Sequence, residues 1–542
     1  MKLLRVHVIS AVTCGGLLDG LDVRLHSAVS SVAVFDPLCL IGPNGAGKSQ
    51  FLQVVAEIFQ SLFHAACTQE ERDDGNRSLQ FEVEYLIARS DGMPSVHVRA
   101  SRKLQKAKKL AIVIERNDDG EWTQCDLASS DTLSLLPTKV VGYTSGGNET
   151  LSLPFLLSRS GYADEVTRQA LNEHQTQTPV PDTRLMLIDY GTHLEVLVSN
   201  LLLGAAEQRE SLLEGAGLKE LHSFRCIVQL AHSAISKVSA QQVARSNRKG
   251  VQLTSELEAY LDQLKRCATC YHIVEKTETY TFDFFVDGES RKAFSAFWSS
   301  SLQLYAALHK LSMLNDLAIP KVTRDRFKRE TKSRRFASRL PEPQDENKVF
   351  RFERVNFRAD GSEEIVDYVS LSDGEHQLAQ LLGTFAMVSF PNVLFLLDEP
   401  ESHFNPQWRV KFISHLMDLP GPQGCRRDSS VAAQQDALIT THSPFLPSDM
   451  SRRNVLVFAK GSTGEVEVRR PEIETYGATF DSILSDCFGV RPPMSDEPKR
   501  EIEALLMSSI PEEIQAGMDR LGYSVEKALL ADRLRQLLNK DS

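Results

Sequence analysis

The sequence predicts an α/β fold whose two halves lie far apart along the chain. Residues 37–63 pass from an apolar strand, PLCLIG, through a glycine-rich loop into an amphipathic helix, SQFLQVVAEIFQSLF. Strand and helix alternation returns from residue 349 to about residue 460, with apolar runs at VLFLLDE, ALITTHS and NVLVFAK. In between, glycines and prolines thin out and long amphipathic stretches dominate. These patterns indicate one domain interrupted by a helical insertion.

The composition is that of a globular protein with two or three domains. Of the 542 residues, 42% are apolar and 25% are charged, which predicts a large core. The net charge of −11 argues against a protein that coats nucleic acid with its whole surface, but it leaves room for one basic patch. The nine cysteines suit a reducing compartment better than a disulfide framework.

Neither a membrane span nor an export signal is expected. The longest apolar run, residues 185–206, is interrupted by Asp189, His193 and Glu195, whereas a span needs roughly 18 apolar residues. The N-terminus, MKLLRVHVIS, places Arg5 where a signal peptide needs an unbroken apolar stretch. We therefore expect a cytoplasmic protein without a membrane partner.

Changes of pattern predict four segments. The N-terminal half of the interrupted domain includes an antiparallel β region between about residues 78 and 141, where LQFEVEYLIA alternates. The helical insertion, the C-terminal half of the domain and a polar helical tail follow. The expected limits of the four segments are residues 1–159, 160–344, 345–493 and 494–542.

The glycine-rich loop, GPNGAGKS, matches the phosphate-loop pattern G-x-x-x-x-G-K-[ST] and lies between a strand and a helix, as the pattern requires. Its glycines let backbone N–H groups surround phosphates, and the helix N-terminus adds its positive dipole. Lys48 is expected to reach the outer phosphates and Ser49 to ligate Mg²⁺. The alternative is a glycine-rich turn that binds nothing. The motif predicts that ATP and Mg²⁺ are bound by Gly42, Pro43, Asn44, Gly45, Ala46, Gly47, Lys48 and Ser49.

Two acidic residues end the apolar strand NVLFLLDEP, which has the form of a Walker B element. Asp398 is expected to hold Mg²⁺, directly or through water, together with Ser49. Glu399 is expected to act as the general base that polarises the attacking water. The alternative is a strand whose terminal carboxylates are merely solvated.

A histidine follows the next apolar strand, in ALITTHSPF. Its place downstream of the Walker B strand predicts that the His442 imidazole contacts the γ-phosphate. A purely structural histidine is the alternative.

The stretch LSDGEHQLAQ begins like a helix, because Ser372 and Glu375 have the spacing of a capping box. Ordinary helix initiation explains part of this pattern. It does not explain Gly374 in the first turn, where glycine costs about 1 kcal/mol relative to alanine. Gly374 therefore predicts a close approach to its backbone.

The motifs GPNGAGKS, LSDGEHQ, LLDEPESHFNP and TTHSP, in this order, resemble those of ATP-binding-cassette (ABC) ATPases of the SMC and RecF-like branch. The resemblance implies a P-loop NTPase head with an antiparallel β subdomain and a large helical insertion. It also implies a homodimer, in which Ser372 and Gly374 of one copy bind the γ-phosphate of ATP held by the other, and residues 401–405 form the D-loop. No glutamine is convincingly placed for the family's glutamine loop, and residues 140–150 are a candidate by position only.

A narrower resemblance rests on FDPLCLIGPNGAGKSQFLQ, GYTSGGNETLSLPF and YGATFDSILSDCFGV. These stretches are similar to restriction-associated ATPases, and more narrowly to the PtuA-like ATPases of Septu antiphage systems, including versions encoded beside retron reverse transcriptases. The resemblance implies an HNH endonuclease partner of the PtuB-like kind. In the retron versions it adds a reverse transcriptase with its RNA-linked DNA.

Two basic stretches could contact nucleic acid. Nine basic and two acidic residues lie between Lys321 and Arg339, with Phe327 and Phe336 available for packing or base stacking. A solvated helix face or a linker is the alternative. The second stretch, RKLQKAKK at residues 102–109, has five basic residues and could equally be a hairpin tip.

The remaining signals for chemistry are weak. Cys267 and Cys270 form a single CxxC, a poor zinc signal without a second ligand pair, and two helix cysteines are the better interpretation. The tail lacks the acidic pattern of a Toprim nuclease, so nuclease activity is expected to come from a partner.

Three functions are open at this stage. The first is an antiphage ATPase that controls an HNH endonuclease through an ATP-dependent head dimer. The second is a DNA-repair or DNA-binding ATPase of the RecF or SMC kind, for which DNA would stimulate hydrolysis with a steep salt dependence. The third, the ATPase subunit of a membrane transporter, is disfavoured by the long insertion and the DEPESHFNP motif.

Overall fold

The structure is a computed structural model of the whole chain. It describes residues 1–540, and every structural statement below refers to the described residues. The ranges outside this description are residues 13–14, 28–33, 90–93, 105–109, 119, 146–148, 172–178, 190, 232–249, 334–342, 422–423, 463 and 541–542.

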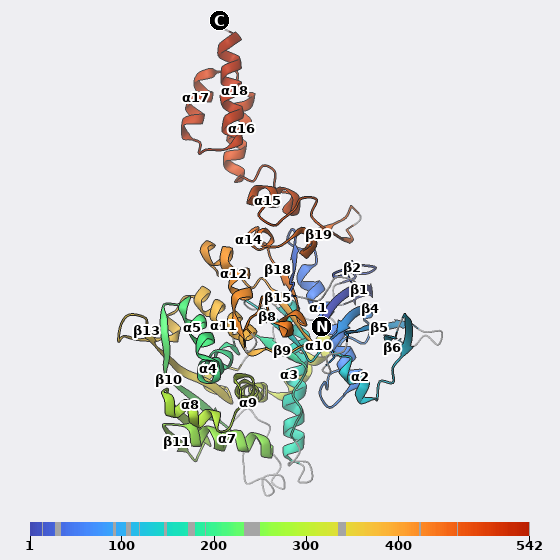
Figure 1. The fold of residues 1–542 in the computed structure, drawn as a ribbon, viewed down its shortest axis with the longest axis vertical. Helices are drawn as coiled ribbons and strands as arrows, with labels where there is room; N and C mark the ends of the chain where they lie inside the picture. The colour runs from blue at the N-terminus through green and yellow to red at the C-terminus, as the bar shows by residue number, and fades with distance from the viewer. Residues whose placement is uncertain are drawn as a thin grey trace.

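A seven-stranded sheet forms the centre of the molecule (Figure 1). Its order is β20-β19-β3-β18-β15-β8-β9, and all neighbours are parallel except β20. The strand before the phosphate loop, β3, is thus separated from the Walker B strand, β15, by β18. The strands are β3 (Leu38–Ile41), β8 (Lys139–Thr144), β9 (Leu185–Ile188), β15 (Val393–Asp398), β18 (Asp436–Thr440), β19 (Val455–Lys460) and β20 (Val466–Arg469).

Both faces of the central sheet are covered, so its inner strands are continuously apolar rather than alternating. In β3, Leu38 and Leu40 pack in the core shared with helix α1 (Lys48–Ala66). Cys39 and Ile41 point to the other face, toward helices α11 (Asp373–Met387) and α12 (Pro406–Asp418). This two-sided burial explains why the runs PLCLIG and NVLFLLDE contain no polar alternation.

The predicted antiparallel sheet is present, with six strands in the order β2-β1-β4-β5-β6-β7. The burial of β4 alternates strictly along its length, and the buried side packs on α1. Two of the strands come from the first 24 residues of the chain, whereas residues 139–144 belong to the central sheet instead. The six are β1 (Lys2–Ser10), β2 (Asp22–Arg24), β4 (Gln80–Ile87), β5 (Val96–Leu104), β6 (Leu110–Asp118) and β7 (Glu121–Gln124).

The helical insertion expected at residues 160–344 is wrong in kind and in extent. The helices are there, but a five-stranded antiparallel sheet, β11-β12-β10-β13-β14, lies among them, and β9 belongs to the central sheet. Two strands of this five-stranded sheet, β13 and β14, lie after the expected boundary at residue 344. The strands are β10 (Leu218–Gln229), β11 (Cys270–Val274), β12 (Thr279–Phe285), β13 (Phe350–Ala359) and β14 (Ile365–Asp367); the helices are α3 (Glu149–Ala170), α4 (His193–Leu203), α5 (Ala206–Glu214), α7 (Ser255–Cys267), α8 (Gly288–Ser295), α9 (Ser301–Met313) and α10 (Lys321–Ser333).

The physical reason lies in two short alternating stretches between the helical ones. In LKELHSFRCIVQ, Phe224 and Cys226 face the core, and in TYTFDFF, Phe282 and Phe284 do so. The rings of Phe224 and Phe284 are stacked with centroids 4.4 Å apart. A period of two with aromatic residues on one side is a strand signal, which the neighbouring amphipathic helices obscured.

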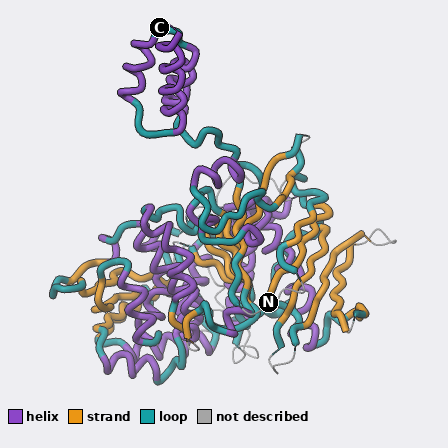
Figure 2. The backbone as a smooth tube through the Cα atoms, turned by 45° about the horizontal axis from the view of Figure 1, so that its top comes forward, coloured by secondary structure: helices purple, strands orange, loops and turns teal. Residues whose placement is uncertain are grey.

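The tail consists of three helices, α16 (Asp496–Met507), α17 (Pro511–Arg520) and α18 (Val525–Lys540), which follow α15 (Phe480–Phe488). Figures 1 and 2 show that it extends away from the rest of the molecule. Its core is small and separate, made by Ile502, Ile514 and Leu530. None of the helices in the described part of the chain combines the length and the apolarity that a membrane crossing needs.

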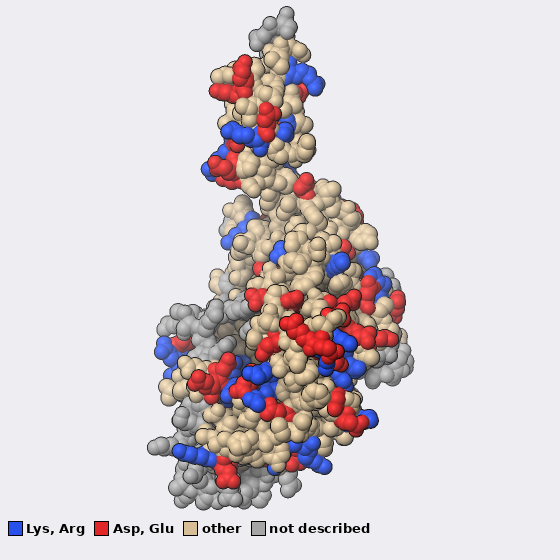
Figure 3. All heavy atoms as spheres, turned by 90° about the vertical axis from the view of Figure 1, so that its left-hand side faces the viewer, with Lys and Arg blue, Asp and Glu red and all other residues tan. Residues whose placement is uncertain are grey.

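Charges of both signs are interspersed on the face that carries β13 and α5. Figure 3 shows acidic side chains gathered near the middle of this face, with basic side chains scattered around them. This distribution agrees with the net charge of −11 and does not suit a surface that follows a phosphate backbone.

A buried ionisable group, Glu195, lies where two helices of the inserted part, α4 and α9, pack together. Glu195 of α4 lies 3% exposed, and burial raises the pKa of its carboxyl to about 7, opposed by a hydrogen bond with Ser312. A carboxyl whose pKa is raised on folding contributes stability that is fully present below its unfolded pKa, near 4.5, and is lost as the pH rises through about 7.

Replacing this carboxyl by an amide should therefore change the pH dependence of stability. We expect Glu195→Gln to stabilise the protein relative to wild type at pH 8 more than at pH 5, by up to about 3 kcal/mol, because the amide needs no ionisation. Melting temperatures of both proteins at the two pH values measure this. Glu207→Gln, an exposed change on the neighbouring α5, is the control. An equal shift of the Glu195→Gln variant at both pH values contradicts the prediction.

Candidate nucleotide-binding site

The phosphate loop connects the end of β3 to the start of α1, as its sequence predicts. Three of its glycines have positive φ angles: 133° at Gly42, 73° at Gly45 and 92° at Gly47. A Cβ atom at Gly42 would lie 2.1 Å from the carbonyl oxygen of Phe458 in β19. Glycine is thus required both by the backbone conformation and by the neighbouring strand. The loop is a cradle of backbone groups at the N-terminus of a 19-residue helix, which suits phosphates.

Lys48 lies across this loop. Its ammonium group donates to the carbonyl oxygens of Gly42, at 2.9 Å, and Pro43, at 3.1 Å. Burial lowers the pKa of Lys48 to about 8, although Glu399 and Asp398 oppose the shift. Among the described residues, no carboxylate is bonded directly to the Lys48 ammonium group. This group is therefore suited to a phosphate ligand.

The carboxylate of Asp398 joins three distant parts of the chain. It accepts hydrogen bonds from Ser49 Oγ at 2.9 Å and from Thr440 Oγ1 at 2.5 Å. Burial raises the pKa of Asp398, while the two hydroxyl groups lower it. Oxygen ligands of this kind suit Mg²⁺, so the side chains of Ser49 and Asp398 would hold it here. Bound Mg²⁺ would neutralise charge on the phosphates of ATP.

Glu399 and His442 form a pair beside this centre. Their Oε1 and Nε2 atoms lie 3.2 Å apart, and the hydrogen bond with His442 is the main cause of the lowered pKa of Glu399. The φ angle of Glu399 is 48°, a left-handed conformation that costs about 1–2 kcal/mol in a non-glycine residue. The N–H of Glu399 donates to Thr440 Oγ1 at 3.1 Å. An ionised, partly exposed carboxylate in this position can accept a proton from water.

The structure thus brings together Ser49, Lys48, Asp398, Glu399 and His442, which the sequence predicted as one site. It adds residues that the sequence reasoning missed. Thr440 Oγ1 donates to the Asp398 carboxylate and accepts the backbone N–H of Glu399, and the Thr441 hydroxyl donates to the buried carboxyl of Glu401. The threonine pair directly before His442 was the available signal.

The helix start LSDGE has the predicted capping geometry. Ser372 is the N-cap of α11, and its Oγ and backbone N–H are 2.8 and 2.7 Å from Glu375 Oε2. The close approach predicted for Gly374 is present, and it is made within the chain. A Cβ atom there would lie 2.7 Å from the carbonyl oxygen of His403 and 3.1 Å from the ring of Trp408. Contact of Ser372 and Gly374 with the ATP of a second copy stays a prediction.

Residues 401–405, the expected D-loop, are tied to α11. Gln377 donates from Nε2 to Ser402 Oγ at 3.3 Å and accepts the N–H of His403 at 3.0 Å. Burial raises the pKa of Glu401, at the start of this segment, to about 7. The segment therefore connects the Walker B strand to the first turns of the LSDGE helix.

The candidate glutamine loop lies beside the site, because β8 runs parallel to β15 and Thr144 pairs in register with Asp398. Of residues 140–150, however, residues 146–148 lie outside the described part of the chain. Its role as the glutamine-loop equivalent stays a prediction.

The basic segment between Lys321 and Arg339 is in part a packing element. Its first 13 residues form α10, in which Phe327 is buried against Leu153 and Leu157 of α3. Arg324 and Lys328 both pair with Asp164 of the same helix, at 2.7 Å for Lys328. Base stacking by Phe327 is therefore excluded.

The remaining basic positions are only partly visible. Arg335, Phe336 and Arg339 lie outside the described residues, as do residues 105–109 of the second basic stretch. The expected contact of residues 321–339 with nucleic acid stays a prediction.

The single CxxC is split between two kinds of element, which corrects the expectation of two helix cysteines. Cys267 is buried at the end of α7, whereas Cys270 is exposed at the start of β11. Within the described ranges, no three His, Cys, Asp or Glu side chains are grouped so that they could hold a metal ion.

Comparison with known proteins supports the reading of this site. Residues 293–449 match the family model described as "AAA domain, putative AbiEii toxin, Type IV TA system". The chain contains an AAA-type P-loop ATPase domain. The matched range includes the LSDGE helix start, the Walker B strand and His442, and supports ATPase activity, for which Mg²⁺ is the usual cofactor. No curated protein was found to match the chain.

Removing the carboxylate of Glu399 tests its assignment as the general base. We expect Glu399→Gln to lower the ATP hydrolysis rate about 10²-fold or more while ATP binding is retained, because general base catalysis contributes about 10²–10⁴-fold. Steady-state phosphate release and nucleotide binding measure the two effects. The control is Glu467→Gln on β20, an exposed site away from these contacts. Unchanged hydrolysis in Glu399→Gln would refute the role of Glu399.

Thr440 is expected to act by holding the carboxylate of Asp398 and the backbone of Glu399. Thr440→Val removes the hydroxyl and should reduce the hydrolysis rate about tenfold, the effect of one lost hydrogen bond to a charged group. Thr440→Ser keeps the hydroxyl and should restore most of the rate. If the valine and serine variants have equal rates, the hydrogen bonds of Thr440 do not position the site.

Proposed function

We propose that the protein is the ATP-binding and ATP-hydrolysing subunit of a bacterial antiphage defence system of the Septu or retron type. In this proposal two copies dimerise through their ATPase heads when ATP is bound, and the dimer controls an HNH endonuclease partner. The observation that carries it is the pairing of Ser49 with Asp398 and of Glu399 with His442 at one sheet edge, in a chain whose LSDGE helix start faces solvent.

The exposure of that helix start supports a site shared between two copies. Ser372 and Asp373 are exposed, and Ser372 makes its described hydrogen bonds with Glu375 rather than with its own phosphate loop. The first turn of α11 presents the positive end of the helix dipole, which suits a phosphate supplied by a second molecule. The same turn is connected through Gln377 to residues 401–405 and hence to Glu399.

The link to defence rests on the family description and on the sequence resemblance. The description of the matched family model names a toxin–antitoxin system, which is consistent with an abortive-infection ATPase. The described part of the chain offers no metal cluster for a nuclease of its own. Control of a separate endonuclease is the simplest way for such an ATPase to become toxic.

The tail is a candidate for holding that partner. Its core has only three fully buried apolar side chains, whereas several large apolar residues are exposed on it. A small helical unit with an apolar surface and an extended position is suited to docking. The exposed residues include Met507, Ile510, Tyr523, Val525 and Leu529.

The dimer is tested at Ser372. In a Glu399→Gln background, which slows hydrolysis, ATP should convert the protein to a dimer in light scattering. Adding Ser372→Arg should abolish the dimer and leave ATP binding within about twofold, because the arginine blocks the helix start of the other copy. Ser362→Arg, an exposed position in the β13–β14 turn, is the matched control. A dimer that survives Ser372→Arg contradicts the shared site.

The partner is tested separately, with the genes that neighbour this one. A stable complex with a co-expressed HNH endonuclease and little stimulation of ATP hydrolysis by DNA supports the proposal. Strong stimulation by DNA with no such complex would favour the DNA-repair alternative.

A further inference from the structure

A cavity lies where the antiparallel sheet meets the central sheet. It encloses about 840 Å³ and is lined on one side by β1, β2, β4 and β5, and on the other by residues 451–454, 470 and 474. Its volume falls in the range of small-molecule sites, roughly 300–1,000 Å³. Five arginines line it, against three carboxylates: Arg5, Arg24, Arg452, Arg453 and Arg470.

This cavity is not the nucleotide site. Asp36, on its wall, precedes β3, and Asn454 precedes β19, whereas the phosphate loop follows the other end of β3. Because β3 and β19 are parallel, the cavity lies at the N-terminal edge of the central sheet and ATP is expected at the opposite edge.

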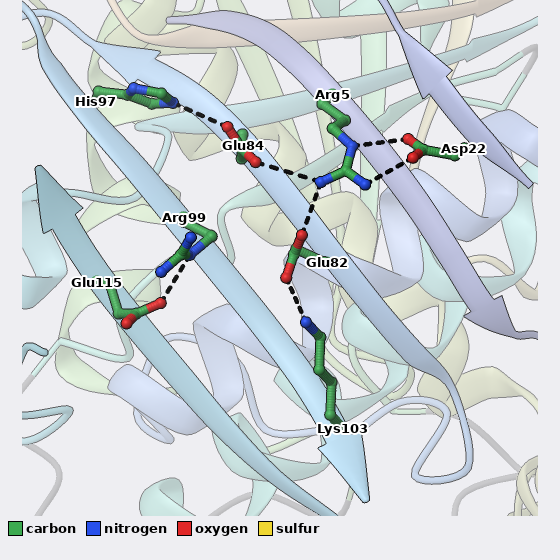
Figure 4. A network of polar contacts seen from close by, with 8 residues as sticks. All are labelled: Arg5, Asp22, Glu82, Glu84, His97, Arg99, Lys103 and Glu115. Atoms are coloured by element: carbon green, nitrogen blue, oxygen red, sulfur yellow. Dashed lines mark hydrogen bonds and ion pairs between the residues drawn. The ribbon is translucent and has the colours of Figure 1, made fainter. Parts of the chain in front are cut away.

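The carboxylates of the wall already have donors. Figure 4 shows Arg5 between Asp22, Glu82 and Glu84, and His97 against Glu84 at 3.2 Å. Arg5 and Glu84 are therefore neutralised within the network on the sheet.

The other two carboxylates are held by the opposite wall. Glu474 accepts the backbone N–H of Arg452 at 2.7 Å and that of Thr475 at 3.1 Å. Asp36 accepts the side-chain amide of Asn454 and lies 3.8 Å from Arg453. These hydrogen bonds do not remove the charge of the two acids, so the positive excess of the lining rests on five arginines against three carboxylates.

Three guanidinium groups of the cavity lack a directly bonded carboxylate among the described residues. Among the described residues, Arg24, Arg452 and Arg470 form no ion pair. Arg470 is fixed, because it donates to the carbonyl oxygens of Leu25 at 2.7 Å and Val455 at 3.3 Å, which connect the two walls. Burial lowers the pKa of Arg470, and the Asp36 carboxylate of the same wall opposes this only in part. Arg24 and Arg452 are exposed at the rim and can reach a ligand.

We propose that this arginine cavity binds a ligand carrying two or more phosphate groups. Arginine is suited to phosphate, because its planar donors bind two oxygens at once. Both a nucleic-acid strand and a free nucleotide have this chemistry. The site lies apart from residues 321–339, and it does not depend on the proposed pairing of heads.

The experiment compares three forms of the full-length protein with two probes. The cavity variant is Arg24→Glu with Arg452→Glu, and the matched control is Arg116→Glu with Arg168→Glu, which makes the same charge change at exposed positions outside the cavity. A fluorescein-labelled single-stranded DNA is measured by anisotropy against salt, and the number of ATP molecules bound per chain by equilibrium dialysis. Equal basal ATP hydrolysis in the three forms shows that each is folded.

Each outcome decides the proposal. If a strand is the ligand, the cavity variant should raise the Kd for DNA at least tenfold and lower the salt slope by about 1.4, the value for two lost single-strand phosphate contacts, while the control changes less than twofold. If a free nucleotide is the ligand, wild type should bind a second ATP per chain that only the cavity variant loses. DNA and ATP binding that is the same in cavity variant and control overturns the proposal.

Discussion

The carboxylate of Asp398 is the interaction on which the rest of the site depends. It bonds Ser49, which lies 349 residues earlier, and Thr440, which lies 42 residues later. A buried carboxylate is costly unless it is hydrogen-bonded, so β3, β15 and β18 must end at the same edge and in one register. Thr440 and Thr144 both pair with Asp398 across the neighbouring strands. The strand order of the central sheet is therefore inseparable from the geometry of the predicted Mg²⁺ site.

The same edge couples the hydrolytic centre to the helix start of α11. Glu399 adopts a left-handed conformation that is held by Thr440 at its N–H and by His442 at its carboxylate. Residues 401–405 follow at once and are bonded to Gln377, one turn into α11. A change at the Glu399 carboxylate can thus reach the LSDGE surface through a few bonded residues, without movement of the sheet.

Much of the site could be predicted from sequence, because its residues occur in short motifs at strand ends. Gly42, Asp398 and His442 needed only the rule that parallel strands end at one edge. Thr440 and Glu401 could not be found in this way, because their roles depend on which strands are neighbours and on which hydroxyl meets which acid. Gly374 shows the opposite case: its sequence signal was real, but the contacting group was the His403 carbonyl of the same chain.

The inserted part was predicted less well, since long amphipathic helices dominated its pattern and its strands are aromatic and short. The arginine cavity was invisible in sequence for another reason: its arginines, such as Arg24 and Arg470, are isolated along the chain and meet only because two sheets meet.

β3 connects this cavity to the phosphate loop. It has four residues, which at about 3.3 Å each span on the order of 13 Å. If the arginine cavity binds phosphate as proposed, this short and fully buried strand is the element that joins it to the phosphate loop.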